Sequence, residues 1–226
     1  MYIVGVTGHS GSGKSEFTSF LNRQSSKLRE LDLEKYFHNI LADNKTGLIK
    51  LYGPKIFKAD GSLDYNFYCS PENAEITDWV RKWIGPQMVD RFYSEAEALK
   101  NVYDIFITTE LQLPSMPIWE QLDKRVFISS DEKERHRRLQ TRSYLPCNPE
   151  EAKHRDISTE KNWANIGTDF ATIHNDYTDD FKVKASRFLH EIIDVSHTKS
   201  KTVIFPPFII HNKDNSLGTS GNHRKT

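Results

Sequence analysis

Eight consecutive residues near the start of the chain have the types and spacing that bind phosphate groups. Residues 8–15 are Gly-His-Ser-Gly-Ser-Gly-Lys-Ser and match the pattern G-x-x-x-x-G-K-[ST] in full. The glycines let the backbone curl so that successive N–H groups point at phosphate oxygens. In such a loop Lys14 reaches the β- and γ-phosphates, and the Ser15 hydroxyl ligates Mg²⁺. The motif predicts a P-loop that binds ATP and Mg²⁺ through Gly8, His9, Ser10, Gly11, Ser12, Gly13, Lys14, Ser15 and Glu16, with Ser15 as the metal ligand.

Transfer of the terminal phosphate also needs a group that orients or deprotonates the acceptor. Asp32 ends a predicted strand at 28–32, and ligand sites in parallel sheets lie at the carboxyl ends of strands. We therefore predict Asp32 as the base; a helix cap or a solvated acid is the alternative. Glu110 follows an apolar segment at 105–107 and is either close to Mg²⁺ or a surface acid.

A very polar helix is predicted after Asp131, and it carries several arginines. Most of its charges, including that of Arg135, are expected to face solvent. Arg138 and Arg142 are four residues apart and would share one helix face, so both could point at one phosphate cluster. Arg142 also begins a loop at which a mobile lid would hinge. Lys14, Asp32 and Arg142 are thus the predicted catalytic residues.

The elements that must position these residues alternate between strands and helices. Apolar segments predict buried strands at 2–7, 28–32, 105–107, 126–128 and 169–175. Helices are predicted after the glycines, over 33–50, from a Ser70 cap with Pro71 in the first turn, again after Gly85-Pro86, after Asp131, and at the end around 181–193. This order predicts an α/β protein whose parallel sheet is covered by helices on both faces.

The composition limits which partners and which cellular compartment we expect for this protein. The 226 residues carry 31 basic and 31 acidic side chains, so the net charge is zero and no global charge favours nucleic acid or membrane as a partner. No apolar run is long enough to span a membrane, and Cys69 and Cys147 form no C-x-x-C pair, so the expectation is a cytoplasmic protein with reduced cysteines, or else one disulfide. Residues 196–226 form a tail that is expected to be disordered from about 211; its segment 202–210 either packs on the domain or docks on a partner.

The order of these segments resembles the dephospho-coenzyme A kinase family over roughly residues 1–195. The opening YIVGVTGHSGSGKS is similar to the first strand and P-loop of the family, and Leu31-Asp32-Leu33 falls on its Asp-x-Asp stretch, with Glu30 in place of the first acid. Further similar segments are Tyr52-Gly53 with 59–64, Arg138-Leu139-Gln140-Thr141-Arg142, 148–152 with Arg155, and 169–175. The family departs from this chain at Tyr65, Gly85-Pro86, the strand end TTELQLP and Asp156, which stands where an apolar residue is common.

The resemblance implies a P-loop NTPase fold of three layers, with a helical acceptor-binding insertion at about 54–100 and a lid at about 131–160. It implies that ATP phosphorylates the ribose 3′-hydroxyl of dephospho-CoA, a small-molecule substrate, with Asp32 as base and Asn175 near the adenine. The oligomer is expected to be a monomer or a small homo-oligomer. A nucleoside or nucleoside monophosphate kinase is the alternative, with a cationic clamp from Arg81, Lys82 and Arg91; a catalytically weak ATP-binding module that acts through its tail is another.

Overall fold

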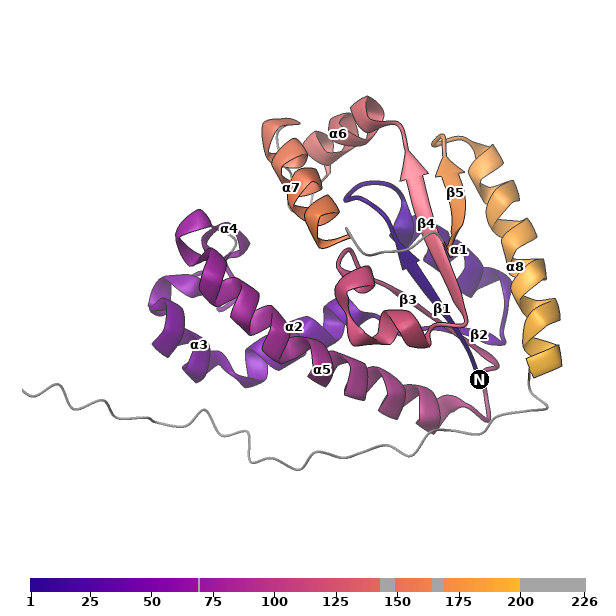
Figure 1. The fold of residues 1–226 in the computed structure, drawn as a ribbon, viewed down its shortest axis with the longest axis horizontal. Helices are drawn as coiled ribbons and strands as arrows, with labels where there is room; N and C mark the ends of the chain where they lie inside the picture. The colour runs from indigo at the N-terminus through magenta and orange to yellow at the C-terminus, as the bar shows by residue number, and fades with distance from the viewer. Residues whose placement is uncertain (69, 143–148, 164–168, 200–226) are drawn as a thin grey trace, which may run out of the picture.

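A single parallel sheet lies at the centre of the molecule (Figure 1). The computed structural model describes residues 1–68, 70–142, 149–163 and 169–199. The sheet has five strands in the order β2-β3-β1-β4-β5, and every pairing is parallel. The strands are β1 (Tyr2–Thr7), β2 (Leu28–Glu30), β3 (Ile105–Thr109), β4 (Lys124–Ser130) and β5 (Ala171–Asn175). Each lies at the position predicted from its apolar segment, which confirms the α/β fold.

The connections between strands are mostly helical. The α-helices are α1 (Lys14–Gln24), α2 (Leu33–Asp43), α3 (Lys45–Tyr52), α4 (Tyr65–Tyr68), α5 (Ala74–Leu99), α6 (Glu132–Thr141), α7 (Pro149–Asn162) and α8 (Asp179–Lys199). Short 3₁₀ helices span Pro54–Ile56, Pro71–Asn73, Leu113–Ser115 and Pro117–Gln121. Among the helices of the described ranges, none has the length and apolar character that a membrane crossing requires. The predicted domain boundary at 195 falls inside α8, which continues to Lys199.

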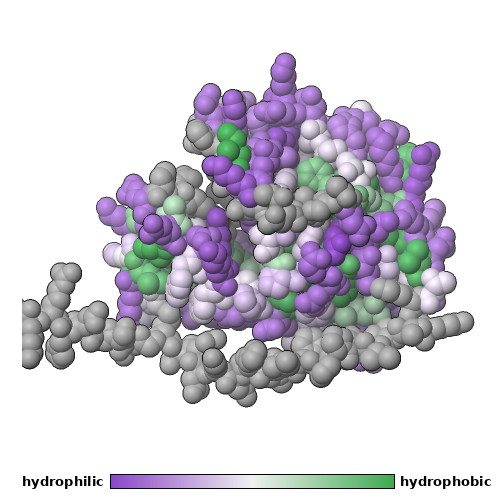
Figure 2. Space-filling view, viewed as in Figure 1, coloured by the Kyte–Doolittle hydropathy of each residue, from purple (hydrophilic) through white to green (hydrophobic). Residues whose placement is uncertain are grey.

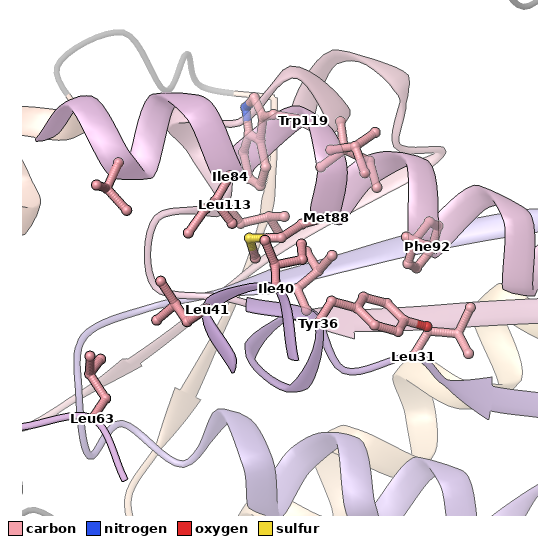
Figure 3. Close-up of a cluster of buried hydrophobic side chains, with 14 of the residues drawn as sticks. Leu31, Tyr36, Ile40, Leu41, Leu63, Ile84, Met88, Phe92, Leu113 and Trp119 are labelled. Atoms are coloured by element: carbon pink, nitrogen blue, oxygen red, sulfur yellow. The ribbon is translucent and has the colours of Figure 1, made fainter. Parts of the chain in front are cut away.

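Two apolar layers cover the two faces of the sheet because alternate strand residues point in opposite directions. In β1, Val4 and Val6 pack with α1 and α8, whereas Ile3 packs on the opposite face with α2, α5 and the turns after β3. Figure 3 shows the second layer, where side chains such as Tyr36, Ile40 and Phe92 gather beside the sheet. On the outer surface drawn in Figure 2, hydrophilic residues predominate and the hydrophobic ones form small separate patches.

Helix α5 differs from the prediction. Two helices were expected around Gly85-Pro86, but one helix of 26 residues runs through Pro86, and it starts at Ala74 after a 3₁₀ turn instead of at Ser70. Proline removes one backbone hydrogen bond from a helix. That loss is tolerated here because the helix packs on the core on both sides of the proline.

The carboxyl ends of the strands face the same edge of the sheet. The segment 8–13 follows β1, Asp32 follows β2, Glu110 follows β3, and Asp131 follows β4. The sheet therefore brings together at one edge the residues that the sequence singled out, as parallel topology requires. The predictions for Cys69, Cys147, the loop after Arg142 and the tail from residue 200 lie outside the described residues.

Candidate active site

The loop between β1 and α1 has the backbone that phosphate binding requires. Gly8, Gly11 and Gly13 have φ values of 144°, 80° and 100°, a region in which side chains are strained. A Cβ at Gly13 would lie 2.1 Å from Nδ2 of Asn175, and one at Gly8 would lie 2.4 Å from the carbonyl oxygen of Ile128. Glycine is thus required for both the curl of the loop and its close contact with β4 and β5.

Lys14 opens α1 and curls back over the loop. Its Nζ donates to the carbonyl oxygens of Gly8 at 2.8 Å and His9 at 3.0 Å. Burial of the ammonium lowers the pKa of Lys14 from 10.5 to about 8, and this effect outweighs the negative charges of Glu110 and Glu34, which raise it. Among the described residues this cation has no carboxylate in direct contact, and phosphate oxygens would supply an anionic partner.

A cavity of about 820 Å³ opens beside the loop. Its size is within the range of small-molecule sites, about 300–1,000 Å³. One wall consists of Lys14, Ser15 and Glu16 from the start of α1, together with Ser10, Gly11 and Gly13. The opposite wall comes from α5 and from the turn after β3, with Arg81, Lys82, Met88 and Met116 among its residues. Acidic and basic side chains thus meet between the P-loop and the predicted acceptor-binding insertion.

Three carboxylates lie near this cavity, in different environments. Glu110 lines it and accepts a hydrogen bond from the backbone N–H of Gln112 at 3.2 Å; burial raises the pKa of Glu110. Glu34 also lines it, and its pKa is lowered chiefly by its pair with His38 and further by the positive charges of Lys14 and Arg142. Asp32 is exposed and is not among the described lining residues. One of its oxygens accepts from the N–H of Lys35 at 3.2 Å, so Asp32 caps α2.

The two arginines that were predicted to act together lie apart. Helix α6 ends at Thr141, and Arg142 has an extended backbone, so the four-residue helical spacing does not place it on the face of Arg138. Arg142 lines the cavity. The Arg138 guanidinium instead lies 4.2 Å from the ring centroid of Tyr177 and is not among the described lining residues.

Arg135 corrects the prediction of a solvated helix face. Its exposed fraction is 4%, because its guanidinium donates to both oxygens of Asp156, at 3.0 and 2.6 Å, and to the carbonyl of Ser10 at 3.3 Å. Sequence reasoning missed this pair, although Asp156 had been noted as an unusual acid. A buried position on so polar a helix has no periodic apolar signal of its own, since only Leu139 is apolar in it.

The last strand contributes contacts to the P-loop backbone. Asn175 is fully buried, and its Nδ2 donates to the carbonyl of Ser12 at 2.9 Å. Tyr177 has a φ of 61°, which is rare for a residue with a side chain, and its hydroxyl donates to the carbonyl of Gly11 at 3.0 Å. The ring of His9 lies on Trp163 with centroids 4.9 Å apart, and the Ser12 side chain is buried below the loop. The P-loop is therefore held from several sides.

Comparisons with known proteins agree with this geometry. The family model described as "Dephospho-CoA kinase" matches residues 2–165. The chain belongs to the dephospho-CoA kinase family. It is accordingly an ATP-dependent kinase, and the family activity is the phosphorylation of dephospho-CoA. No curated protein matches the sequence significantly.

Solved structures show that this dephospho-CoA kinase has the fold of P-loop kinases. TT1252 from Thermus thermophilus superposes with a TM-score of 0.64 at 19% identity, over 86% of this chain and 97% of that one. The dephospho-CoA kinase from Campylobacter jejuni has a TM-score of 0.51 at 20% identity, over 84% and 96% of the two chains. Shikimate kinase from Bacteroides thetaiotaomicron has a TM-score of 0.51 at 14% identity, over 85% and 98%.

Proposed function

We propose that this chain phosphorylates the ribose 3′-hydroxyl of dephospho-CoA, with ATP held by the P-loop and the acceptor held in the part of the cavity formed by α5. The observation that carries this proposal is that two pairs of cations, Lys14 with Arg142 and Arg81 with Lys82, line the same cavity. Phosphates of the donor fit the first pair of cations. The second pair would contact the negatively charged diphosphate of the acceptor.

In the transfer step the acceptor hydroxyl oxygen bonds to the γ-phosphorus as the bond from that phosphorus to the ADP oxygen breaks. Lys14 exchanges its two carbonyl contacts for oxygens of the transferring group and offsets their charge. Arg142, which also lines the cavity, adds a planar donor. The hydroxyl proton passes to a carboxylate at the end of β2.

We assign that carboxylate to Asp32, which caps α2 through one oxygen and keeps the other available in solvent. A specific observation favours Glu34 as a second candidate, because Glu34 lines the cavity and feels the charges of Lys14 and Arg142. Asp32→Asn retains a good helix cap and Glu34→Gln retains shape, so the two variants can be compared directly. The base is the residue whose substitution lowers kcat by about 10²-fold or more while the Kd for ATP stays within twofold.

Mg²⁺ fits the oxygen donors present at this edge of the sheet. The Ser15 hydroxyl lines the cavity at the helix start, and the Glu110 carboxylate follows the neighbouring strand. Hydroxyl, carboxylate and phosphate oxygens are the ligands that Mg²⁺ prefers. We propose that Ser15 holds the ion and that Glu110 holds water bound to it. The ion, when bound, neutralises charge on the β- and γ-phosphates.

We also propose that the enzyme acts in the cytoplasm as a monomer or small homo-oligomer, without a nucleic-acid partner; its zero net charge supports the last point. A nucleotide clamp of three cations is less well supported than a pair, since Arg81 and Lys82 line the cavity and Arg91 is not among its described lining residues.

An ADP-release assay with purified protein tests the acceptor assignment. The acceptors compared are dephospho-CoA, adenosine and a panel of nucleoside monophosphates, each at equal concentration with saturating MgATP. We expect the highest kcat/KM for dephospho-CoA. Faster turnover of a nucleoside monophosphate would contradict the assignment of the acceptor, and absence of turnover with every acceptor would favour a catalytically weak ATP-binding protein.

A further inference from the structure

Two carboxylates of α7 lie against the residues that surround the P-loop. Asp156 and Glu160 are four residues apart, which places both on one face of the helix. Asp156 contacts Arg135 of α6, and Glu160 contacts His9 of the P-loop itself. Two polar contacts thus link α7, which lies beside α6 in Figure 1, to the P-loop and to the arginine that supports it.

The contact through Asp156 is buried and bidentate. Its carboxylate accepts from both terminal nitrogens of Arg135 and pairs with Nε2 of His136 at 3.0 Å, and its side chain is only 13% exposed. A planar guanidinium held at two points has a fixed orientation. The same Arg135 group donates to the Ser10 carbonyl at 3.3 Å, so the orientation set by Asp156 extends to the backbone of the P-loop.

The contact through Glu160 holds His9, the residue before Ser10 in the P-loop. Nε2 of His9 lies 3.1 Å from a Glu160 oxygen, and because a carboxylate only accepts, the imidazole is the donor. The His9 ring also packs on Trp163, whose indole N–H donates to the carbonyl of Leu111 at 3.0 Å. Residues 9 and 10 are thus both held by side chains that lie outside the phosphate-binding motif.

We propose that Asp156 and Glu160 are positioning residues for ATP, which hold His9 and Ser10 so that the amides of the P-loop already point at the phosphates before ATP binds. Preorganised donors lose little entropy on binding and need no rearrangement. This inference rests on ATP as the donor and is independent of the identity of the acceptor.

Direct measurement of the Kd for MgATP by calorimetry, on the full chain, tests the proposal. The variants are Arg135→Lys, which keeps the charge but loses the bidentate contact, Asp156→Asn, and Glu160→Gln. The matched control is Arg137→Lys, on the same helix, whose exposed guanidinium pairs with Glu134. We expect Kd to rise about tenfold for the first two variants and about threefold for the third, as the loss of a charged hydrogen bond implies, and to change less than twofold for the control.

A KM measurement separates positioning from a general loss of structure. The KM for dephospho-CoA at saturating ATP should stay within twofold in all four variants, because the α5 wall of the cavity is untouched. If Kd for ATP is within twofold of the unmodified protein in all three test variants, the proposal is wrong. If the unmodified protein does not bind ATP, the proposed function fails instead.

A double variant covers the case in which Asp156→Asn or Arg135→Lys unfolds the chain. Removing one member of a buried ion pair is strongly destabilising, whereas replacing both by apolar residues often restores stability. Arg135→Leu with Asp156→Leu should therefore melt close to the unmodified protein and still bind ATP about tenfold more weakly. Recovery of both melting temperature and Kd would show that the pair only stabilises the fold. Glu160 is 60% exposed, so Glu160→Gln should fold in any case and tests the second contact on its own.

Discussion

The lowered pKa of Lys14 makes ATP binding depend on pH in a way that the structure specifies. The pKa is about 8 in the empty protein because burial disfavours the ammonium. Bound phosphates favour the charged form, so we expect the pKa of Lys14 to be raised in the complex and the ammonium to stay protonated over this range. Protonated Lys14 falls from about three quarters at pH 7.5 to about one tenth at pH 9, from the titration of one group. If only the protonated form binds, the affinity for MgATP should fall roughly eightfold over this interval.

Calorimetry in two buffers of different ionisation enthalpy measures both consequences of this argument. Kd should rise with pH as stated, and at pH 9 binding should take up about 0.9 proton per ATP, which the difference between the buffers reports. Lys14→Arg should bind more weakly at pH 7.5, yet its Kd should be independent of pH, because guanidinium does not titrate in this range. A Kd for the unmodified protein that stays within twofold from pH 7.5 to 9, or an equal slope for Lys14→Arg, would refute the assignment.

The contribution of Lys14 to the free energy of unfolding changes with pH in the opposite direction to the affinity for MgATP. The pKa of Lys14 is lower in the folded protein than in the unfolded chain, where it is near 10.5. Between about pH 8 and 10.5 the unfolded state holds more protons, so this residue's contribution to the free energy of unfolding increases with pH in that interval. Lys14→Met should abolish that component of the pH dependence, which urea unfolding at pH 7.5 and 9.5 would measure.

Two further variants test the backbone of the P-loop and the role of Arg142. Gly13→Ala should lower the free energy of unfolding by about 2–4 kcal/mol, since it adds left-handed strain and displaces the buried Asn175 amide. Urea unfolding measures this change. The control is Gly85→Ala, whose Cβ would meet nothing within 4 Å and which should be neutral or slightly stabilising. Arg142→Lys should lower kcat by about tenfold or more with a smaller change in KM, while Arg137→Lys should behave as the unmodified enzyme in the same steady-state assay. Equal behaviour of the two lysine variants would remove Arg142 from the site.

The strand and loop predictions agree with the structure because they rest on local physics. A short apolar segment that ends in a G-x-x-x-x-G-K-S sequence has few alternatives to a buried strand that enters a P-loop, and β1 and α1 have this arrangement. The second strand ends at Glu30, two residues earlier than predicted, and Asp32 follows it. The roles weighed for Asp32, base or cap, depend on side-chain direction, which spacing does not give. The structure shows the cap.

At Pro86, packing against the core outweighs the local tendency of proline to end a helix. Gly85-Pro86 is a sound signal for a helix end, and a solvated helix would have broken there. Val80, Ile84 and Met88 are buried on both sides of the pair and continue the same apolar layer, so their packing holds the helix together across it. Such compensation comes from residues distant in sequence and cannot be derived from the segment alone.

The expectation that Arg135 faces solvent was wrong for a reason that also explains the departure at Asp156. A guanidinium that is 4% exposed is tolerable only beside a buried anion, and a buried carboxylate is tolerable only beside a cation, so neither Arg135 nor Asp156 makes physical sense alone. An acid where relatives have an apolar residue therefore implied a buried cation nearby, and the polar helix 21 residues earlier was a source of one. Composition cannot rank the arginines of α6, but among them only Arg135 lies four residues from Leu139, the single apolar residue of that helix. Asp156 pairs with Arg135, which donates to the Ser10 carbonyl, so this departure lies beside the P-loop and is not evidence of a lost acceptor site.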